Sequence, residues 1–426
     1  MTRLRSSRFL FWSAILLSTL RLTVAAEPDP AEVLKRAAAK VLSSSRHIPN
    51  YTCVQTVNRN YFRAAQSSNP CAASPLDDSP TLDRLIAADR LRLEVTVAER
   101  GEIYSWAGAR NFVDATVDRV VSSGPIGSGA FAVFLSSAFA QNGGKLTFLG
   151  DLNAGGSHFL EYSFNVHEVD SNYRVKLISG DNSWVKTAYS GMVRIDAETA
   201  DVVRLTVRTA MLPPAAGTCR TLTSIDYENV KLAGSQFPLP ALARQRFLFP
   251  SGQETDNAIT FAGCREYQAE TTLAFEDPGH AASQSPNQKP ELPAVPPDLR
   301  FTLELTTPIR TATAAAGDPF TARLAEPLLR FPATILAPKG TVVKGRLTRV
   351  EFNIPTKDVV LMLKPETLDI PGATVRLRAT RYQDRKNHVI LLRRPGEEDS
   401  GGFILKGRDI VVPKGFRSEW RTLPVP

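Results

Sequence analysis

The sequence predicts an α+β protein, in which a curved antiparallel sheet carries helices and is followed by a small all-β barrel or sandwich domain. From residue 145 to residue 275, most segments alternate polar and apolar side chains, as half-buried strands do. Two segments, 29–45 and 128–142, instead repeat apolar side chains at four-residue spacing, which is typical of helices with one apolar face. A proline-rich stretch, 278–297, then precedes a region, 298–426, that is β-like nearly throughout.

The N-terminus has the pattern of a cleaved export signal. Three arginines precede an apolar run, Phe9–Leu17, and the small residues Val24–Ala26 follow it. Arg21 interrupts the apolar stretch before it reaches the roughly 20 residues that span a membrane, which disfavours the alternative of an uncleaved anchor. We therefore expect residues 1–26 to be a signal peptide, and the mature chain to be periplasmic or secreted and peripheral to the membrane.

Charge is distributed unevenly along the chain. The 51 Lys+Arg and 43 Asp+Glu give a net charge of +8, and loss of the four arginines in residues 1–26 leaves 47 − 43 = +4, which predicts no nucleic-acid partner. Residues 298–426 contain 22 basic and 14 acidic residues, a net of +8, so the rest of the mature chain has a net of −4. We expect the basic region to dock to another envelope component, the alternative being an ordinary solvated surface.

The cysteine pattern agrees with an oxidising compartment. Cys53, Cys71, Cys219 and Cys264 are even in number and form no CxxC motif or zinc-like Cys/His spacing. Three pairings are possible, and four reduced thiols are the alternative. We favour Cys53–Cys71 with Cys219–Cys264, because each pair closes a local segment that has the pattern of two strands and a connection.

Local signals support the elements in turn. Asp29 and Pro30 form the N-terminal signature of a helix, whose apolar face includes Val33, Ala37 and Val41. The run 51–57 and the alternating run 90–97 predict strands, and Gly101 turns the second into a hairpin with 102–106. A second helix is expected to begin at Ser128. The segments 191–196 and 202–207 predict another hairpin.

The layout of residues 29–277 resembles a known superfamily. It has a helix, a Tyr-Thr-Cys strand, a hairpin that ends in Tyr104-Ser105-Trp106, an aromatic helix, and the strand pair Tyr189–Leu205. This arrangement is similar to the periplasmic half-barrels of lipoprotein carriers (LolA-like) and of the related regulator of the sigma-E response. The resemblance implies a curved antiparallel half-barrel over residues 27–277. The four cysteines and the loop around Cys71 depart from the minimal carrier pattern.

Two short sequence segments within residues 298–426 resemble a second known family. They are Gly317–Leu324 and the run Ile335–Leu347, which contains Ile-Leu-Ala-Pro-Lys-Gly-Thr. These are similar to the β-barrel domain of conjugal-transfer (type IV secretion) channel subunits. Because no long apolar segment follows Ala26, the resemblance implies a scaffold rather than a channel.

Catalytic and metal-binding motifs are missing from the sequence. No GxSxG, HExxH, GxxxxGK[ST] or GxGxxG motif occurs, and the five histidines lack ligand spacing. The Gly-rich run 124–129 is explained by Ser128 as a helix cap. We expect a protein without enzymatic activity, cofactor or metal, and keep an unrecognised hydrolase only as a weak alternative.

The resemblance suggests where a ligand would bind. A half-barrel has little core, so its apolar surface would accept a lipid, a lipidated protein or an apolar peptide. The candidate ligand-binding residues are Trp106, Phe131, Phe134, Leu135, Phe139, Leu160, Tyr162 and Phe164. The alternative functional class is a structural or assembly protein of an envelope or secretion complex, with a filled core and no ligand.

Overall fold

The structure is a computed structural model, and it describes residues 28–63, 71, 84–98, 101–109, 115–131, 133–139, 145–178, 183–267, 294–330, 334–382, 393–394 and 396–424. The expected signal peptide, 1–26, and most of the proline-rich stretch lie outside the described residues. The described helices are α1 (Pro30–His47), α2 (Val117–Val120) and α3 (Val133–Phe139), with 3-10 turns at Glu168–Asp170 and Pro214–Ala216.

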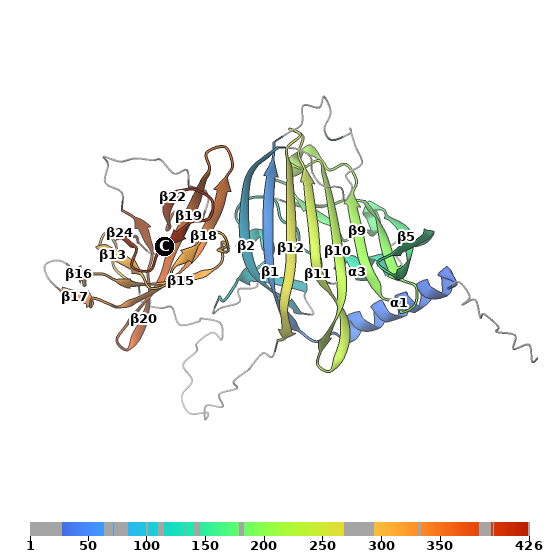
Figure 1. The fold of residues 1–426 in the computed structure, drawn as a ribbon, viewed down its shortest axis with the longest axis horizontal. Helices are drawn as coiled ribbons and strands as arrows, with labels where there is room; N and C mark the ends of the chain where they lie inside the picture. The colour runs from blue at the N-terminus through green and yellow to red at the C-terminus, as the bar shows by residue number, and fades with distance from the viewer. Residues whose placement is uncertain are drawn as a thin grey trace, which may run out of the picture.

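Ten long antiparallel strands form a curved sheet, here called the half-barrel (Figure 1). Neighbouring strands run in the order β4-β5-β8-β9-β10-β11-β12-β1-β2-β3. Their bounds are β1 (Tyr51–Phe62), β2 (Leu85–Ala98), β3 (Gly101–Trp106), β4 (Thr147–Ala154), β5 (Ser157–Val166), β8 (Tyr189–Asp196), β9 (Val202–Thr209), β10 (Arg220–Leu232), β11 (Ser235–Leu248) and β12 (Glu254–Glu266). A separate small hairpin joins β6 (Arg174–Lys176) to β7 (Trp184–Lys186).

The remaining strands form a second body beside β2 (Figure 1). Its paired strands follow the order β22-β19-β18-β15-β13-β24-β21, with β20 also on β19. Their bounds are β13 (Arg300–Leu305), β15 (Pro319–Leu324), β18 (Val342–Asn353), β19 (Asp358–Ile370), β20 (Ala373–Arg376), β21 (Ala379–Arg381), β22 (Gly401–Lys406) and β24 (Arg417–Thr422). Two small ladders pair β14 (Ile309–Arg310) with β23 (Val411–Val412), and β16 (Leu328–Arg330) with β17 (Thr334–Ala337).

The predicted α+β class is wrong. The described chain is mostly strand, in a large open antiparallel sheet. The three α-helices have 18, 4 and 7 residues, whereas the four strands β1, β10, β11 and β12 alone have 12, 13, 14 and 13. The two apolar helix patterns predicted a layer of helices, whereas the helices are few and cover one face of a β structure.

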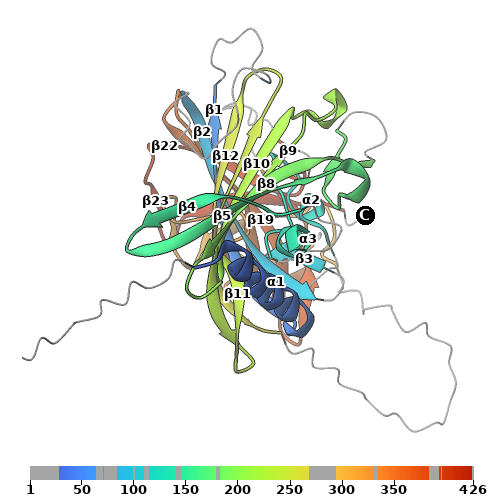
Figure 2. The same ribbon diagram turned by 90° about the vertical axis from the view of Figure 1, so that its right-hand side faces the viewer.

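Local chemistry explains how α1 forms and where it packs. Asp29 caps it by accepting a hydrogen bond from the backbone N–H of Ala31, at 3.1 Å, and Pro30 occupies the first turn. Val33, Ala37 and Val41, at four-residue spacing, are its buried residues. They join the first hydrophobic core, and α1 packs on α3, β8 and β11. Figure 1 shows α3 behind the strands, and Figure 2 shows α1 and α3 on the same side of them.

Strand β2 belongs to both bodies, because part of its outer edge pairs with β18. Next to that pairing, Arg92 N–H donates to the carbonyl of Ala316 at 2.7 Å, and Ala316 N–H donates to the carbonyl of Arg90 at 2.8 Å. Gly317 follows with φ +104°, and a Cβ there would lie 2.2 Å from the Arg92 carbonyl oxygen. Asp318 pairs with the Arg92 guanidinium. Gly317 and Asp318 therefore attach the second body to the edge of the half-barrel, Gly317 by its close approach to the β2 backbone and Asp318 by its ion pair.

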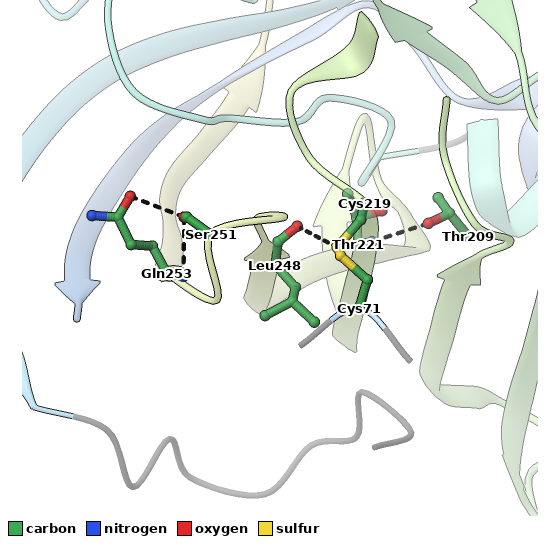
Figure 3. Close-up of a disulfide and its surroundings, with 7 residues drawn as sticks. All are labelled: Cys71, Thr209, Cys219, Thr221, Leu248, Ser251 and Gln253. Carbon is green, nitrogen blue, oxygen red and sulfur yellow. Dashed lines mark hydrogen bonds between the residues drawn. A yellow bond between two sulfur atoms is a disulfide. The ribbon is translucent and has the colours of Figure 1, made fainter. Parts of the chain in front are cut away.

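The disulfides differ from the predicted pairing, which is wrong. The bonds are Cys53–Cys264 and Cys71–Cys219. Strand β1 pairs with β12, although Cys53 and Cys264 in these strands are 211 residues apart in sequence. A register shift after Thr52 places both Gly263 and Cys264 opposite Cys53. The favoured local pairs fail because this long-range strand pairing has no signal in local sequence. Figure 3 shows the second bond, next to the point where Thr221 N–H donates to Thr209 Oγ1 at 3.0 Å.

Candidate functional site

The structure brings seven of the eight predicted ligand-binding residues into one buried cluster, and the eighth packs against it. Trp106 is the partly buried one. The others are 1% to 8% exposed: Phe131, Phe134, Leu135, Phe139, Leu160, Tyr162 and Phe164. The residues from β5, from α3 and from the turn before α3 thus belong to the same hydrophobic core.

Aromatic rings make up much of this interior. Phe134 of α3 lies 5.2 Å from Tyr173 and 6.5 Å from Tyr189, measured between ring centroids. Phe131 packs edge-on against Tyr51 of β1, at 5.9 Å, and against Phe261 of β12, at 4.9 Å. Tyr51 and Tyr189 come from strands on opposite sides of the sheet's middle, so the rings span its width. Offset and edge-on ring contacts of this kind stabilise a packed state beyond their area.

Glu102 of β3 holds the turn that precedes α3. Its carboxylate accepts hydrogen bonds from the backbone N–H of Gly129, at 2.7 Å, and of Phe131, at 3.1 Å. Tyr104 also donates to it, at 2.6 Å. This replaces the predicted role of Ser128, because α3 begins only at Val133 and the turn amides donate to a carboxylate from the sheet. We call α1, α3 and the segment 121–131 the cover.

Burial keeps the tyrosines around Glu102 in their protonated form. Desolvation, together with the Glu102 carboxylate, raises the pKa of Tyr104 and of Tyr227 well above the ordinary value. Tyr227 donates its hydroxyl proton to the backbone carbonyl of Ala130, at 3.1 Å. The turn is thus held by acceptors and donors from two different strands, β3 and β10.

A row of polar side chains, which was not predicted from the sequence, crosses the inner face of the sheet. Arg59 of β1, which is 1% exposed, forms a two-pronged ion pair with Asp89 of β2, with both contacts at 2.7 Å. On β12 and β11, Asn257 donates to the carbonyl of Pro125, at 3.0 Å, and Gln245 accepts from Gly127 N–H, at 3.0 Å.

The Gly-rich segment 124–129 is shaped to this polar row. A Cβ at Gly124 would lie 2.5 Å from Arg59 Nη1, and one at Gly127 would lie 2.8 Å from Gln245 Nε2. A side chain at either position would therefore force the end of Arg59 or Gln245 to move. The sequence does contain a signal for the polar row. In β1, Arg59 occupies a position of the alternating pattern that faces inward, as Cys53 and Val57 do.

Two oxygen atoms on the inner face of β1 are buried and have no hydrogen-bond partner among the described residues. They are Tyr51 Oη and Gln55 Oε1, on side chains that are 0% and 2% exposed. A buried polar group without a partner costs about 1–3 kcal/mol. Because α3 and the turn before it lie over this face, the oxygens point into the interior that the cover closes.

A small cavity lies between the two bodies, next to the Arg59–Asp89 end of the polar row. Its volume is about 30 Å³, enough for a water molecule or two and far too small for a lipid chain. It is lined in part by Arg59, Trp106, Arg349 and Arg394. The three arginines already pair with Asp89, Glu397 and Glu351.

We expect Glu102→Gln to loosen the cover. The amide keeps only one acceptor oxygen and no charge, and hydrogen bonds to a charged group contribute about 1.5–3 kcal/mol. Amide hydrogen exchange of residues 129–139 is expected to speed up by about tenfold or more. Glu228→Gln, which neutralises an exposed carboxylate on β10, is the matched control and is expected to leave these amides unchanged. Equal exchange in both variants would show that ring packing alone holds the turn.

Two further properties of the described residues concern metal binding and membrane spanning. Within those ranges, no group of three His, Cys, Asp or Glu side chains is placed to hold a metal ion. None of the helices in the same ranges is both long and apolar enough to cross a membrane.

Comparisons with known proteins found similar solved structures only. No family model matches the chain, and no curated protein matches it. A LolA superfamily protein from Nitrosomonas europaea is 6% identical, over 56% of this chain and 93% of that one, with a TM-score of 0.25. A putative outer membrane lipoprotein-sorting protein domain from Vibrio parahaemolyticus is 10% identical, over 57% and 95%, with a TM-score of 0.27. These names agree with the resemblance stated for residues 29–277, but likenesses at such TM-scores carry no argument about family or function. None of the comparisons shows the resemblance to channel subunits, which stays a prediction.

Proposed function

We propose that this is a non-enzymatic, exported cell-envelope protein that binds an amphiphilic ligand inside the half-barrel. The ligand would be a lipid, the lipid group of a lipidated protein, or an apolar peptide. The observation that carries the proposal is the construction of the interior. An aromatic face of an open sheet is closed by short segments rather than by a second sheet, so the cover can move away without breaking any strand pairing.

The chemistry of the interior favours an amphiphile. When α3 and the preceding turn move outward, an apolar chain can take the place of Phe131 and Phe134 against the sheet. Burial of apolar surface contributes about 25 cal/mol per Å², and this gain offsets the lost ring contacts. A polar group on the same ligand could satisfy Tyr51 Oη and Gln55 Oε1, which have no partner in the closed state.

The compartment and the docking region form part of the same proposal. Two disulfides, with no free cysteine among the described residues, agree with an oxidising environment outside the cytoplasm. The excess of basic over acidic residues in 298–426 supports a role of this region in docking to an anionic envelope component. The second body is attached along β2, so a partner bound there would sit beside the half-barrel.

The second candidate function is a structural or assembly protein that binds no ligand. The observation in its favour is that the predicted ligand-binding residues already fill the interior. In that case the two bodies would act as interaction surfaces for protein partners.

Native mass spectrometry tests the two functions against each other. The chain from Glu27 onward is purified under native conditions, and spectra are recorded before and after organic extraction. A lipid-sized adduct that extraction removes, and that exchanges faster in Glu102→Gln, is the expected result. A bare polypeptide mass that stays unchanged after incubation with envelope lipids would overturn the ligand proposal and favour the assembly protein.

A further inference from the structure

We propose that the outer face of the β6–β7 hairpin is a docking surface for a membrane that contains anionic phospholipid. This surface is distinct from the basic second body, and the proposal does not depend on whether the half-barrel binds a ligand. It rests on the register of the hairpin, on the exposure of its side chains and on its charge.

The register gathers cations on one face of the hairpin. Arg174 lies opposite Lys186, and Lys176 lies opposite Trp184. Cross-strand partners share a face of the ribbon, and residues two apart along a strand share it as well, so these four side chains point the same way. Val175 and Val185, also paired with each other, form the opposite face.

Two of these three cations have no acidic partner among the described residues. Lys176 pairs with Asp118, at 2.7 Å. Arg174 and Lys186 are exposed, and neither forms an ion pair with any described residue. Like charges directly opposite each other destabilise a hairpin. An anionic surface would offset this repulsion, because each cation close to it gains about 1 kcal/mol of binding free energy.

Exposed apolar side chains accompany the cations. Trp184 is 48% exposed, and Ile178, just after β6, is 71% exposed. Ile178 N–H donates to the carbonyl of Ala215, at 2.9 Å, which ties the hairpin to the loop that carries Met211, 53% exposed. Tryptophan and lysine or arginine side chains prefer the level of the lipid headgroups, where the ring is half-buried and the charges meet phosphates.

The position of the hairpin connects this surface with the cover. Tyr173 directly precedes Arg174, and its ring packs on Phe134 of α3. Thr187 N–H closes the base of the hairpin on the carbonyl of Tyr173, at 3.1 Å. A membrane bound to the outer face would therefore lie next to the segment that covers the aromatic interior.

The experiment measures binding of the purified chain to vesicles of phosphatidylcholine, with and without phosphatidylglycerol, by co-sedimentation. We expect binding only with phosphatidylglycerol, weakened by salt because surface charge attraction is screened. The double variant Arg174→Glu with Lys186→Glu is expected to weaken binding by about thirtyfold or more. Should this variant lose its circular dichroism spectrum, Arg174→Gln with Lys186→Gln replaces it, with an expected loss of about tenfold or more.

A matched control makes the same charge change on the second body. Arg330 is the last residue of β16 and Lys339 follows β17; both are exposed, and neither forms an ion pair with a described residue. Arg330→Glu with Lys339→Glu is expected to bind vesicles as the unchanged protein does. An equal loss in the control would overturn the proposal and assign docking to the basic second body or to net charge alone.

Fluorescence supplies a second readout at the surface itself. Trp184 is exposed, whereas Trp106 is partly buried and Trp420 is fully buried. Anionic vesicles are expected to shift the emission to shorter wavelength, and Trp184→Phe is expected to abolish the shift. Unchanged binding in the Arg174 and Lys186 variants, or a shift that persists in Trp184→Phe, would overturn the proposal.

Discussion

Asp89→Ala is expected to lower the free energy of unfolding by about 3–5 kcal/mol, because it leaves the Arg59 guanidinium buried without its counter-charge. Arg59 is 1% exposed and donates to both Asp89 oxygens. The same arginine donates to the carbonyl of Ser123, at 2.6 Å, so the loss also reaches the cover. Urea unfolding followed by circular dichroism and by tryptophan fluorescence measures the change, and coincidence of the two curves checks two-state behaviour.

Two controls separate this effect from a general loss of charge. Asp201→Ala removes a partly exposed partner of Lys40 and Asn229 and is expected to cost about 1 kcal/mol. Arg59→Met combined with Asp89→Leu removes both buried charges and is expected to cost less than Asp89→Ala alone. If Asp89→Ala lowered the free energy of unfolding by no more than Asp201→Ala does, Asp89 would not be the counter-charge that stabilises the buried Arg59 guanidinium.

Cys53→Ala with Cys264→Ala is expected to lower the free energy of unfolding by about 2–5 kcal/mol. This bond joins residues 211 apart in sequence, and it lies beside the first core, where Cys53 is fully buried. Its removal frees a long loop in the unfolded chain, and paired alanines leave no unmatched thiol. Urea unfolding under non-reducing conditions measures the loss.

The matched variant is Cys71→Ala with Cys219→Ala, whose bond joins residues 148 apart. The difference in loop length changes the entropic contribution to the free energy of unfolding by only about 0.3 kcal/mol. A comparable loss of stability is therefore expected. Each double variant is expected to show no free thiol under denaturing conditions, because the other bond stays intact. Titration of two thiols in either variant, or a tryptic fragment in which Cys53 is linked to Cys71, would contradict the connectivity in the structure.

Features fixed by neighbouring residues could be predicted from the sequence. The capped start of α1 at Asp29 and its four-residue apolar spacing were sufficient for that helix. The hairpin of β8 and β9 followed from alternation, and its register sets Val193 opposite Leu205. In each case the determining interactions join residues close in sequence, where spacing alone reports the geometry.

Features fixed by distant pairing could not be predicted. Nothing near Cys53 indicates that β1 will meet β12, so the disulfide prediction chose local partners and was wrong. The fold class failed for a related reason, since short amphipathic helices have the same pattern whether they form a layer or only cover a sheet. The candidate aromatic residues could be placed in the interior because they are apolar, whereas Arg59 and Asp89 were not expected there because charged residues usually lie on the surface.

The pairing of β1 with β12 also sets the order in which the chain can fold. At about 5–20 residues per second, Cys264 follows Cys53 during synthesis only after roughly 10–40 seconds, whereas Cys71 follows within a few seconds. During that interval, the edge of β1 that later pairs with β12 has no partner strand. The thiol nearest to Cys53 in sequence is that of Cys71, whose native partner is Cys219. Oxidation that outruns synthesis would therefore trap Cys53 with the wrong partner, so a native yield depends on late oxidation or on a disulfide isomerase.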